Sequence, residues 1–591
     1  MTDLPDYKAL TKKGLHEIAL GKPAEAAASF EAALKAKPDF LPAQKALSQA
    51  YYMEGRYAAA VAASAKVIAA EPGDLANSLN HGICLYGASD FSEAAAYLAR
   101  GMDSKQANAH HRLLRLKSLI RMEAFDAALE AMAQLRASGA VSPEIDLVDF
   151  ELRQKTNAWG DYDALLARLA DISRLPGAHI VPSATLAAPK LGGADQRRIA
   201  EAWTAKICAG IKPLPPAEVP TDRKIRVGYV SPDLQVHHPI GRHFQAVFAA
   251  HNRSDFEVIG YSLKARRERS AAIYEACDRV HFLEGQSDAA IAQLIRDDKI
   301  EVLADLGMHT DGARPRILAF RPAPVQVSFI GHSATTGAAF MDYMITYDAL
   351  MRAASADHFT EATATHRDPF LNGAWDRPEP EPVSRAELGI AEDAVLFCSF
   401  CSNHKITPDI FELWLRLLND VSGSLLWLRD FGPVPTDNLQ ARAAAAGVAP
   451  DRLLFAKNES VARFFGRLQC ADLFLDTAPY SAGSSATDAL WAGLPIVTLA
   501  GETYVSRMAA SCLIASGLPD LVTTSREAYF TKASELAKSR EARGRYRAHL
   551  LSTRATNPLF DTLGYTRQIE SLYRKMSQRF RAGERPSPMS V

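Results

Sequence analysis

Small and aromatic residues recur every 34 positions through the first third of the chain. One ladder is alanine, at Ala26, Ala60, Ala94 and Ala128, and another is aromatic, at Tyr57, Phe91 and Phe125. A third runs through the expected turns, at Gly21, Gly55, Ser89 and Glu123. This period is typical of helix–turn–helix repeats that stack into a solenoid with a concave groove. We predict an all-α repeat solenoid over residues 1–135 whose groove binds a partner protein or, alternatively, serves as a packing spacer or dimer contact.

The pattern changes further along the chain. Residues 136–222 show irregular helical periodicity and end in a proline-rich stretch, KPLPPAEVPTDRK. Short apolar runs then alternate with helical stretches, namely IRVGYVS, FEVIGYSL, IEVLADLG and VQVSFIGH. A second series starts near residue 394 with VLFCSF, SLLWLRD, RLLFA, DLFLDT and PIVTLAG. Strands that alternate with helices favour parallel sheets covered on both faces.

These changes divide the chain into five predicted regions. The repeats at 1–135 are followed by a helical linker region at 136–222, two Rossmann-like α/β halves at 223–380 and 381–550, and a C-terminal helix and tail at 551–591. The hinge between the halves is expected in the proline-rich segment 378–382. Two doubly wound domains in tandem usually hold a ligand at the carboxyl ends of their strands.

Composition and charge exclude several classes of partner. Lys plus Arg is 67 and Asp plus Glu is 68, so no global basic field exists to hold nucleic acid or an anionic membrane. No run of about 18 apolar residues occurs, so no membrane-spanning helix is predicted. The seven cysteines are an odd number and scattered, which fits a reducing compartment. We therefore expect a cytoplasmic protein with no nucleic-acid or membrane partner.

Cys398 and Cys401 form an isolated C-x-x-C motif in the strand-like segment VLFCSFC. Three-residue spacing on a strand places the two thiols on opposite faces. No second pair completes a four-cysteine zinc site. We interpret both cysteines as packing residues rather than as a redox or metal motif.

Two features of the second half suit an anionic ligand. Gly483, Ser484 and Ser485 follow the strand-like LFLDT and open a helix, whose free N–H groups can bind phosphate; the alternative is that a serine caps the helix. Lys405 follows the strand-like VLFCSF and could neutralise a phosphate leaving group. Lys457 follows RLLFA in the same manner. For both lysines the alternative is an ordinary solvated side chain.

Histidines cluster after the first predicted strand of the α/β region, at His237, His238 and His243. One of them could act as a general base near neutral pH. Packing or capping is the alternative, and metal binding is weaker because no acidic or cysteine ligand accompanies them. His309 also follows a strand-like run and faces the same choice.

Several long strings together resemble one known family. The 34-residue units resemble tetratricopeptide repeats, and they precede VGYVSPD, DGARPRILAFRPAPVQVSFIGH, TTGAAFMDYMIT, TDALWAGLPIVTLAGETYVSRMAAS and NPLFDTLGYTRQIESLY. In this order the strings resemble the O-GlcNAc transferase and SPINDLY group, glycosyltransferase family 41. The resemblance implies a GT-B fold and an inverting transfer of a sugar from a nucleotide donor that needs no metal and no other cofactor.

The resemblance also implies roles for individual residues. His238 matches the family histidine near the acceptor and the sugar, and Lys405 matches the lysine near the donor phosphates. Asp305, acting through water, is an alternative base. Donor contacts are expected from His309, Phe464, Arg467, Gly483, Ser484, Ser485 and Asp488, in addition to Lys405.

The chain departs from the family pattern where the base and sugar would bind. Phe464 stands at the position of the histidine that stacks on uracil, and Val461 at that of the lysine that contacts the nucleoside. Cys401 and Ser402 replace an asparagine–glutamine pair before Lys405. Arg467 keeps the arginine near the base. These changes leave the phosphate contacts largely in place and alter the others.

At this length and repeat content the chain is similar to flagellin glycosyltransferases of alphaproteobacteria, which are associated with pseudaminic acid carried on CMP. We therefore expect a protein O-glycosyltransferase that modifies Ser or Thr of flagellin, recruited by the tetratricopeptide repeats, with a CMP-linked nonulosonic acid as donor. Two alternatives remain open: a UDP-GlcNAc-dependent O-GlcNAc transferase, and a non-catalytic repeat adaptor or flagellin chaperone. A homodimer is a further possibility.

Overall fold

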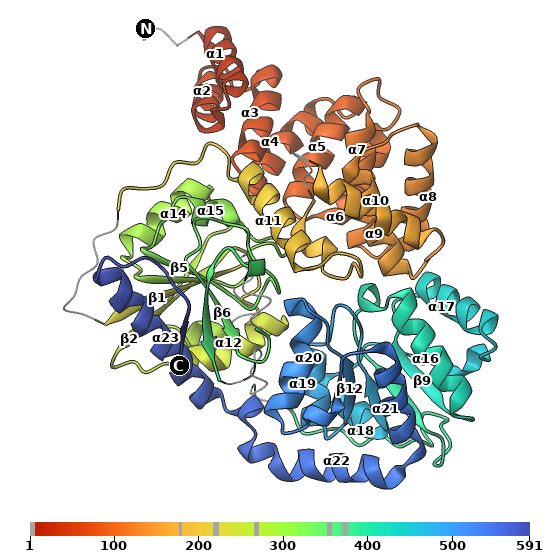
Figure 1. Ribbon diagram of the computed structural model, residues 1–591. Helices are drawn as coiled ribbons and strands as arrows, with labels where there is room; N and C mark the ends of the chain where they lie inside the picture. Colours follow the sequence, from red (N-terminus) through yellow and green to blue (C-terminus); the bar gives the residue numbers. More distant parts are fainter. Residues whose placement is uncertain are drawn as a thin grey trace. The chain divides into compact units, whose positions relative to one another are not determined.

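The computed structural model describes residues 6–175, 180–216, 224–264, 271–351, 357–367, 369, 375 and 377–591 (Figure 1). The chain divides into two compact units, one of Met1–Leu152 with Leu283–Leu294 and one of Arg153–Phe282 with Ile295–Val591. The predicted boundary between residues 222 and 223, and most of the proline-rich stretch before it, lie outside the described residues.

The first unit contains antiparallel helix pairs. The helices are α1 (Tyr7–Ala19), α2 (Pro23–Ala36), α3 (Leu41–Met53), α4 (Tyr57–Ala70), α5 (Leu75–Gly87), α6 (Phe91–Gly101), α7 (Ala109–Arg121) and α8 (Phe125–Ala137), and the unit ends within α9 (Pro143–Thr156). Ala26, Ala60, Ala94 and Ala128 are all fully buried, as expected where a small residue lets two helices pack closely.

The residues that recur every 34 positions in the turns share one backbone conformation. Gly21 and Gly55 have φ of +71° and +77°, and Ser89 and Glu123 keep the same left-handed conformation at +62° and +58°. Glycine adopts this conformation at no steric cost, whereas an L side chain does so only where the structure imposes it. The register of the repeat therefore fixes the turn even where the residue type changes.

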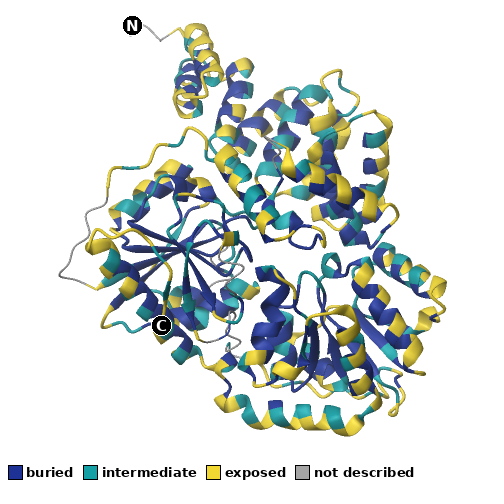
Figure 2. Ribbon diagram, viewed as in Figure 1, coloured by how far each residue is buried: buried dark blue, intermediate teal, exposed yellow. Residues whose placement is uncertain are grey.

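The second unit contains two parallel sheets. The first has the strand order β14-β7-β6-β5-β4-β1-β2-β3. Its strands are β1 (Ile225–Ser231), β2 (Phe256–Ser262), β3 (Arg279–Phe282), β4 (Val302–Asp305), β5 (Val325–Phe329), β6 (Tyr343–Tyr347), β7 (Ala362–His366) and β14 (Met589–Ser590). Each pairs in parallel with its neighbour, and β1, β2, β4, β5 and β6 are buried over most of their length (Figure 2), whereas β3 at the sheet edge is partly exposed.

Helices surround this first sheet and complete what we call the first lobe. They are α12 (Pro239–Ala250), α13 (Ala271–Glu275), α15 (Pro315–Ala319) and the late helix α23 (Thr562–Arg581), whereas α14 (Asp288–Asp297), which follows β3 in the sequence, belongs mostly to the first unit. The core under α12 and α23 is aromatic and fully buried, with Tyr229, Phe244, Phe248 and Tyr573 at its centre.

The second lobe has a six-stranded parallel sheet in the order β10-β9-β8-β11-β12-β13. Its strands are β8 (Leu396–Ser399), β9 (Leu425–Arg429), β10 (Leu453–Ala456), β11 (Leu473–Leu475), β12 (Ile496–Leu499) and β13 (Val522–Thr523). The helices are α16 (Pro408–Asp420), α17 (Pro433–Ala445), α18 (Val461–Cys470), α19 (Ser484–Trp491), α20 (Met508–Ala515), α21 (Arg526–Lys538) and α22 (Arg540–Thr553). The predicted repeat solenoid followed by two Rossmann-like domains is confirmed.

The chain then returns to the first lobe. On α23, Glu570 accepts hydrogen bonds from the His251 ring at 3.1 Å and from the Asn252 N–H at 2.6 Å, both at the end of α12. The Tyr573 hydroxyl donates to the Tyr229 hydroxyl of β1 at 3.2 Å. Strand β14 then pairs with β7 at the sheet edge. Residues 562–590 are thus built into a lobe whose other strands end at residue 366.

In the sequence, the repeats are followed by α10 (Tyr162–Arg174), the 3-10 turn η1 (Pro182–Thr185) and α11 (Gly193–Ile207), all before β1. Side chains in the last turn of α9 and just after it reach the second lobe. The Asn157 amide donates to the Asn403 carbonyl at 3.2 Å. The Gln154 amide donates to the His404 carbonyl at 3.0 Å. Among the helices in the described ranges, none is long and apolar enough to cross a membrane.

Candidate active site

The carboxyl edge of the second sheet brings Lys405 to the small-residue loop. Strand β8 is followed by the 3-10 turn Asn403–Lys405, and neighbouring β11 by residues 476–483. Lys405 Nζ donates to the Ser481 carbonyl at 3.2 Å and lies 3.8 Å from the centroid of the Tyr480 ring. Neither contact neutralises the ammonium charge, so Lys405 suits an anion bound beside this loop.

Asp476 shapes the same loop, and the sequence analysis missed it. Its carboxylate accepts the N–H groups of Thr477 and Ala482, each at 2.8 Å, and the Thr498 hydroxyl at 2.6 Å. Burial raises the pKa of Asp476 to about 6, although these donors favour its charged form. The signal in the sequence was an acidic residue directly after an apolar strand, beside a run of small residues.

The loop ends at the start of α19. Gly483 is the N-cap of this helix, and no side-chain cap accompanies it, so the alternative of a capping serine is wrong. Ser484 and Ser485 begin the helix and are half-buried. A helix N-terminus that carries two hydroxyls and lies near a lysine can bind phosphate through its N–H groups and its dipole.

Asp305 is the last residue of β4, and His309 follows this strand, at the carboxyl edge of the first sheet. Burial raises the pKa of Asp305 to about 7, although the N–H groups of Met308 and Gly307 favour its charged form. Asp305 Oδ2 is buried and has no hydrogen-bond partner within the described residues. A carboxyl group that titrates near neutral pH can take a proton during a reaction.

His309 is buried beside Asp305. Its Nε2 lies 2.7 Å from the Thr336 carbonyl, and its ring meets His332 edge-on at 4.9 Å between centroids. Burial lowers the pKa of His309 to about 4, so the ring is neutral near pH 7.

The histidines after β1 have different surroundings. His238 is the N-cap of α12: its Nδ1 accepts the Ile240 N–H at 3.3 Å, and its Nε2 lies 3.9 Å from an Asp233 oxygen. Burial lowers the pKa of His238 and raises that of Asp233. His243 packs in the core against Phe244 and Tyr565, as the packing alternative predicts.

Two residues expected to contact the donor, Arg467 near the base and Asp488 in the helix after the phosphate loop, have partners within the protein. Arg467 donates to the Lys457 carbonyl at 2.7 Å and pairs with Glu459. Asp488 forms an ion pair with Arg377 at 2.9 Å. These contacts hold α18 and α19 in place, and roles of Arg467 and Asp488 in donor binding stay predictions.

Phe464 is half-buried and meets Phe400 edge-on at 5.7 Å between centroids. Val461 is 39% exposed at the start of α18. A partly exposed ring at this edge leaves a surface on which a base could stack, so this role of Phe464 also stays a prediction.

Cys398 and Cys401 are both buried, as expected of packing residues. Burial raises the pKa of each thiol. Within the part of the chain that the structure describes, no group of three or more His, Cys, Asp or Glu side chains is arranged to hold a metal ion.

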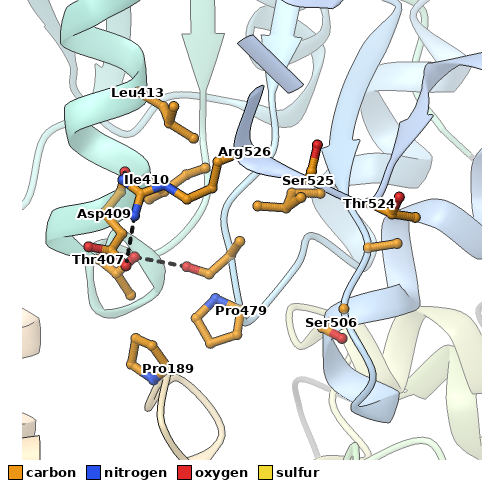
Figure 3. A pocket seen from close by; sticks show the side chains of 14 residues that line it. Pro189, Thr407, Asp409, Ile410, Leu413, Pro479, Ser506, Thr524, Ser525 and Arg526 are labelled. Atoms are coloured by element: carbon orange, nitrogen blue, oxygen red, sulfur yellow. Dashed lines mark hydrogen bonds and ion pairs between the residues drawn. The ribbon is translucent and has the colours of Figure 1, made fainter. Parts of the chain in front are cut away.

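A separate pocket of about 290 Å³ opens on the second lobe (Figure 3). It lies between the starts of α16 and α21, where Arg526 pairs with Asp409 at 3.2 Å, and Pro189 and Pro479 close it on another side. None of the predicted site residues lines it, so this pocket is not the predicted donor site.

The fold and these two edges define a two-lobed GT-B architecture with anion-binding groups on one sheet and proton-accepting groups on the other. Comparison with known families agrees: the family model described as "Glycosyl transferase family 41" matches residues 159–378 and 376–569, and a tetratricopeptide-repeat model matches residues 17–80. The chain belongs to glycosyltransferase family 41, as the resemblance predicted.

Two relatives of this chain are both named as peptide N-acetylglucosaminyltransferases. A protein of Arabidopsis thaliana named as the probable UDP-N-acetylglucosamine–peptide N-acetylglucosaminyltransferase SEC is 33% identical over 392 residues, covering 64% of this chain and 40% of the relative. The UDP-N-acetylglucosamine–peptide N-acetylglucosaminyltransferase of Caenorhabditis elegans is 26% identical over 558 residues, covering 72% and 48%. This chain thus spans less than half the length of either relative.

The fold has a close match among solved structures. The K341M mutant of the Thermobaculum terrenum O-GlcNAc transferase superposes with a TM-score of 0.64 at 23% identity and covers 99% of both chains. At this identity the match concerns the fold alone.

Proposed function

We propose that the chain is a protein O-glycosyltransferase that transfers N-acetylglucosamine from UDP-GlcNAc to Ser or Thr hydroxyls of a protein. Membership of glycosyltransferase family 41 supports the class, and the names of the relatives support this donor ahead of a CMP-linked one. The observation that carries the proposal is the Lys405 ammonium, which lies beside the loop that opens α19 and makes no direct ion pair with a carboxylate of the described residues. No observation on the described residues favours flagellin as the acceptor.

The reaction assigns a role to each sheet edge. The acceptor hydroxyl oxygen attacks the anomeric carbon of the sugar while the bond from that carbon to the phosphate oxygen breaks. The proton of the hydroxyl passes to a base, either Asp305 through water or His238. UDP leaves with the electron pair of the broken bond, and Lys405 and the N–H groups at the start of α19 stabilise its developing charge.

A groove in the first unit is suited to hold part of the acceptor. It has a volume of about 520 Å³ and is formed by α3, α5 and the start of α7. Uncharged polar side chains line much of it: Gln49, Asn80, Gln106 and Asn108. Side-chain amides can donate to and accept from an extended peptide backbone. We propose this groove as the site that recruits a protein.

A CMP-linked donor remains a second candidate because of two residues. Val461 offers no hydrogen bond to a nucleoside, and the Phe464 ring can stack on any base. Losing a uridine contact does not create a cytidine site, so CMP is the second donor to test.

The test is incubation of the full chain with a protein extract and each donor, UDP-GlcNAc or a CMP-linked nonulosonic acid, followed by mass spectrometry of Ser- and Thr-linked sugars. We expect N-acetylglucosamine on protein with the wild type and far less of it in the same time with Lys405→Ala. A non-catalytic adaptor would give no modification and no hydrolysis of either donor, and that outcome would overturn the proposal.

A further inference from the structure

Glu361 is a buried carboxylate under the turn that faces His309. It lies directly before β7, is 5% exposed, and contacts the turn that follows β5. Its Oε1 accepts the Thr336 N–H at 2.7 Å and also the Thr336 hydroxyl, and its Oε2 accepts the Thr335 hydroxyl at 2.7 Å. A buried carboxylate requires such donors, so Glu361 and the two threonines hold each other in one arrangement.

Helix α11 also packs against the turn that contains Thr336 and holds it in place. Gly337 has a φ of +64°, and a Cβ at this position would lie 2.2 Å from the carbonyl carbon of Ala200. From the same helix, the Thr204 hydroxyl donates to the Thr336 carbonyl at 2.9 Å. The turn is therefore fixed between Glu361 and α11, and the direction of the Thr336 carbonyl is fixed with it.

This carbonyl determines which ring nitrogen of His309 carries the hydrogen. The Thr336 oxygen can only accept, so His309 Nε2, at 2.7 Å from it, must donate. In the neutral ring Nδ1 then has a free lone pair, and this buried atom has no hydrogen-bond partner among the described residues. An unpartnered buried acceptor in an active site is available for a substrate donor.

We propose that Glu361 is a positioning residue that, through the Thr336 carbonyl, holds His309 in the tautomer whose Nδ1 accepts a hydrogen bond from a hydroxyl group of the bound sugar or acceptor. This inference rests on the proposed function and extends it, because it names the atom that meets a hydroxyl and the buried carboxylate that orients it.

The tautomer can be measured without any substrate. In the ¹⁵N spectrum of histidine-labelled full-length protein, the His309 signals, assigned by their loss in His309→Gln, should show hydrogen on Nε2 alone. Glu361→Ala should give a mixture of tautomers. Glu361→Gln keeps the shape and an oxygen for the Thr336 N–H, so it should match the wild type.

Hydrogen on Nδ1 in the wild type, or an unchanged His309 spectrum in Glu361→Ala, would overturn the proposal. The first of these needs no variant at position 361, so it holds even if Glu361→Ala does not fold. The measurement also stands if no donor is ever turned over, which separates failure of this proposal from failure of the proposed function.

A double-mutant cycle separates positioning from general stability. We expect His309→Gln to lower kcat by on the order of 10-fold or more, and Glu361→Ala by about 10-fold, from one misplaced hydrogen bond. The double variant should be no slower than His309→Gln, because Glu361 acts through His309. Losses that multiply would show an independent structural role and overturn the proposal.

Donor binding identifies the source of the hydroxyl. If a sugar hydroxyl meets Nδ1, His309→Gln should weaken binding of UDP-GlcNAc while leaving UDP unchanged. If the acceptor hydroxyl meets Nδ1, both affinities stay as in the wild type and the KM for the protein acceptor or kcat changes. Either result supports the inference, whereas an equal loss of UDP and UDP-GlcNAc affinity would contradict it.

Discussion

The carboxyl edges of the two sheets carry different chemistry although both belong to parallel α/β lobes. On the first, burial shifts Asp305 and His309 towards their neutral forms at pH 7. On the second, Lys405 lies beside a helix start and contacts the Ser481 carbonyl and the face of the Tyr480 ring. We infer that proton transfer belongs to the first edge and charge stabilisation to the second. Each can therefore be altered separately.

The largest effect is expected at the second edge. Lys405→Ala should lower transfer by on the order of 10²- to 10³-fold, because a cation at a developing phosphate charge is lost. The melting temperature should hardly change, since Lys405 makes no buried ion pair in the described contacts. Steady-state kinetics with UDP-GlcNAc measures this. Lys457 is an exposed lysine after β10, and Lys457→Ala is the matched control. An equal loss of transfer in Lys457→Ala would mean that the donor phosphates lie nearer α18.

At the first edge, Asp305→Asn should lower transfer by on the order of 10²-fold. In the wild type the rate should rise with pH through about 7, where Asp305 loses its proton, and in the variant this rise should disappear. His238→Asn is the competing variant. If it removes the rise and Asp305→Asn does not, the base is His238.

A second test of Asp305 is the stability of the fold, which the substitution Asp305→Asn should raise although it lowers the rate of transfer. The pKa of Asp305 is raised above the unfolded value, so the fold loses stability as pH rises from about 4 to about 7 and loses no more above that. Asp305→Asn should therefore melt at a higher temperature than the wild type at pH 8. An unchanged or lower melting temperature would contradict the burial that we assign to this carboxyl.

The sequence revealed the two edges because each reactive residue follows an apolar strand within a few positions, and adjacent parallel strands end at the same edge. It did not reveal the residues that hold these side chains and their loops in place. Asp488 is 111 residues from Arg377, and Glu361 is 26 and 25 residues from Thr335 and Thr336, which it holds. Such pairs depend on tertiary structure, and nothing in the local pattern of either residue predicts its partner.

We expect the stability of the first lobe to depend on contacts of α23, and a substitution of Glu570 on this helix tests that expectation. Burial acts to raise the pKa of Glu570, but hydrogen bonds from His251, the Asn252 N–H and Arg567 outweigh it and lower the pKa to about 2. This stabilisation is present above about pH 4.5 and lost as pH falls towards 2.

Glu570→Gln should therefore lower the free energy of unfolding at pH 7 by about 2 kcal/mol. Urea titration measures it. The exposed pair of Arg416 and Glu527 in the second lobe offers the control, because an exposed ion pair contributes little to stability and Glu527→Gln should cost much less than Glu570→Gln. Equal costs for the two variants would mean that the α23 contacts do not hold the first lobe.

The smallest effect is expected at the nucleoside. Phe464→Ala should weaken UDP binding about tenfold, because stacking of a base on an aromatic ring contributes about 1–3 kcal/mol. Calorimetric titration with UDP and CMP measures it for both bases. Equal losses would show that the ring does not distinguish them, and no loss would make Phe464 a packing residue of α18.

The return of residues 562–590 to the first sheet has a consequence for synthesis on the ribosome. Strands β1 to β7 emerge early, yet Tyr229 and the edge of β7 lack Tyr573 and β14 until more than 200 further residues are made. Throughout that interval an apolar surface and an unpaired strand edge of the nascent chain are open to chaperones or to aggregation. The second lobe, whose strands all lie between residues 396 and 523, can fold while the first still waits.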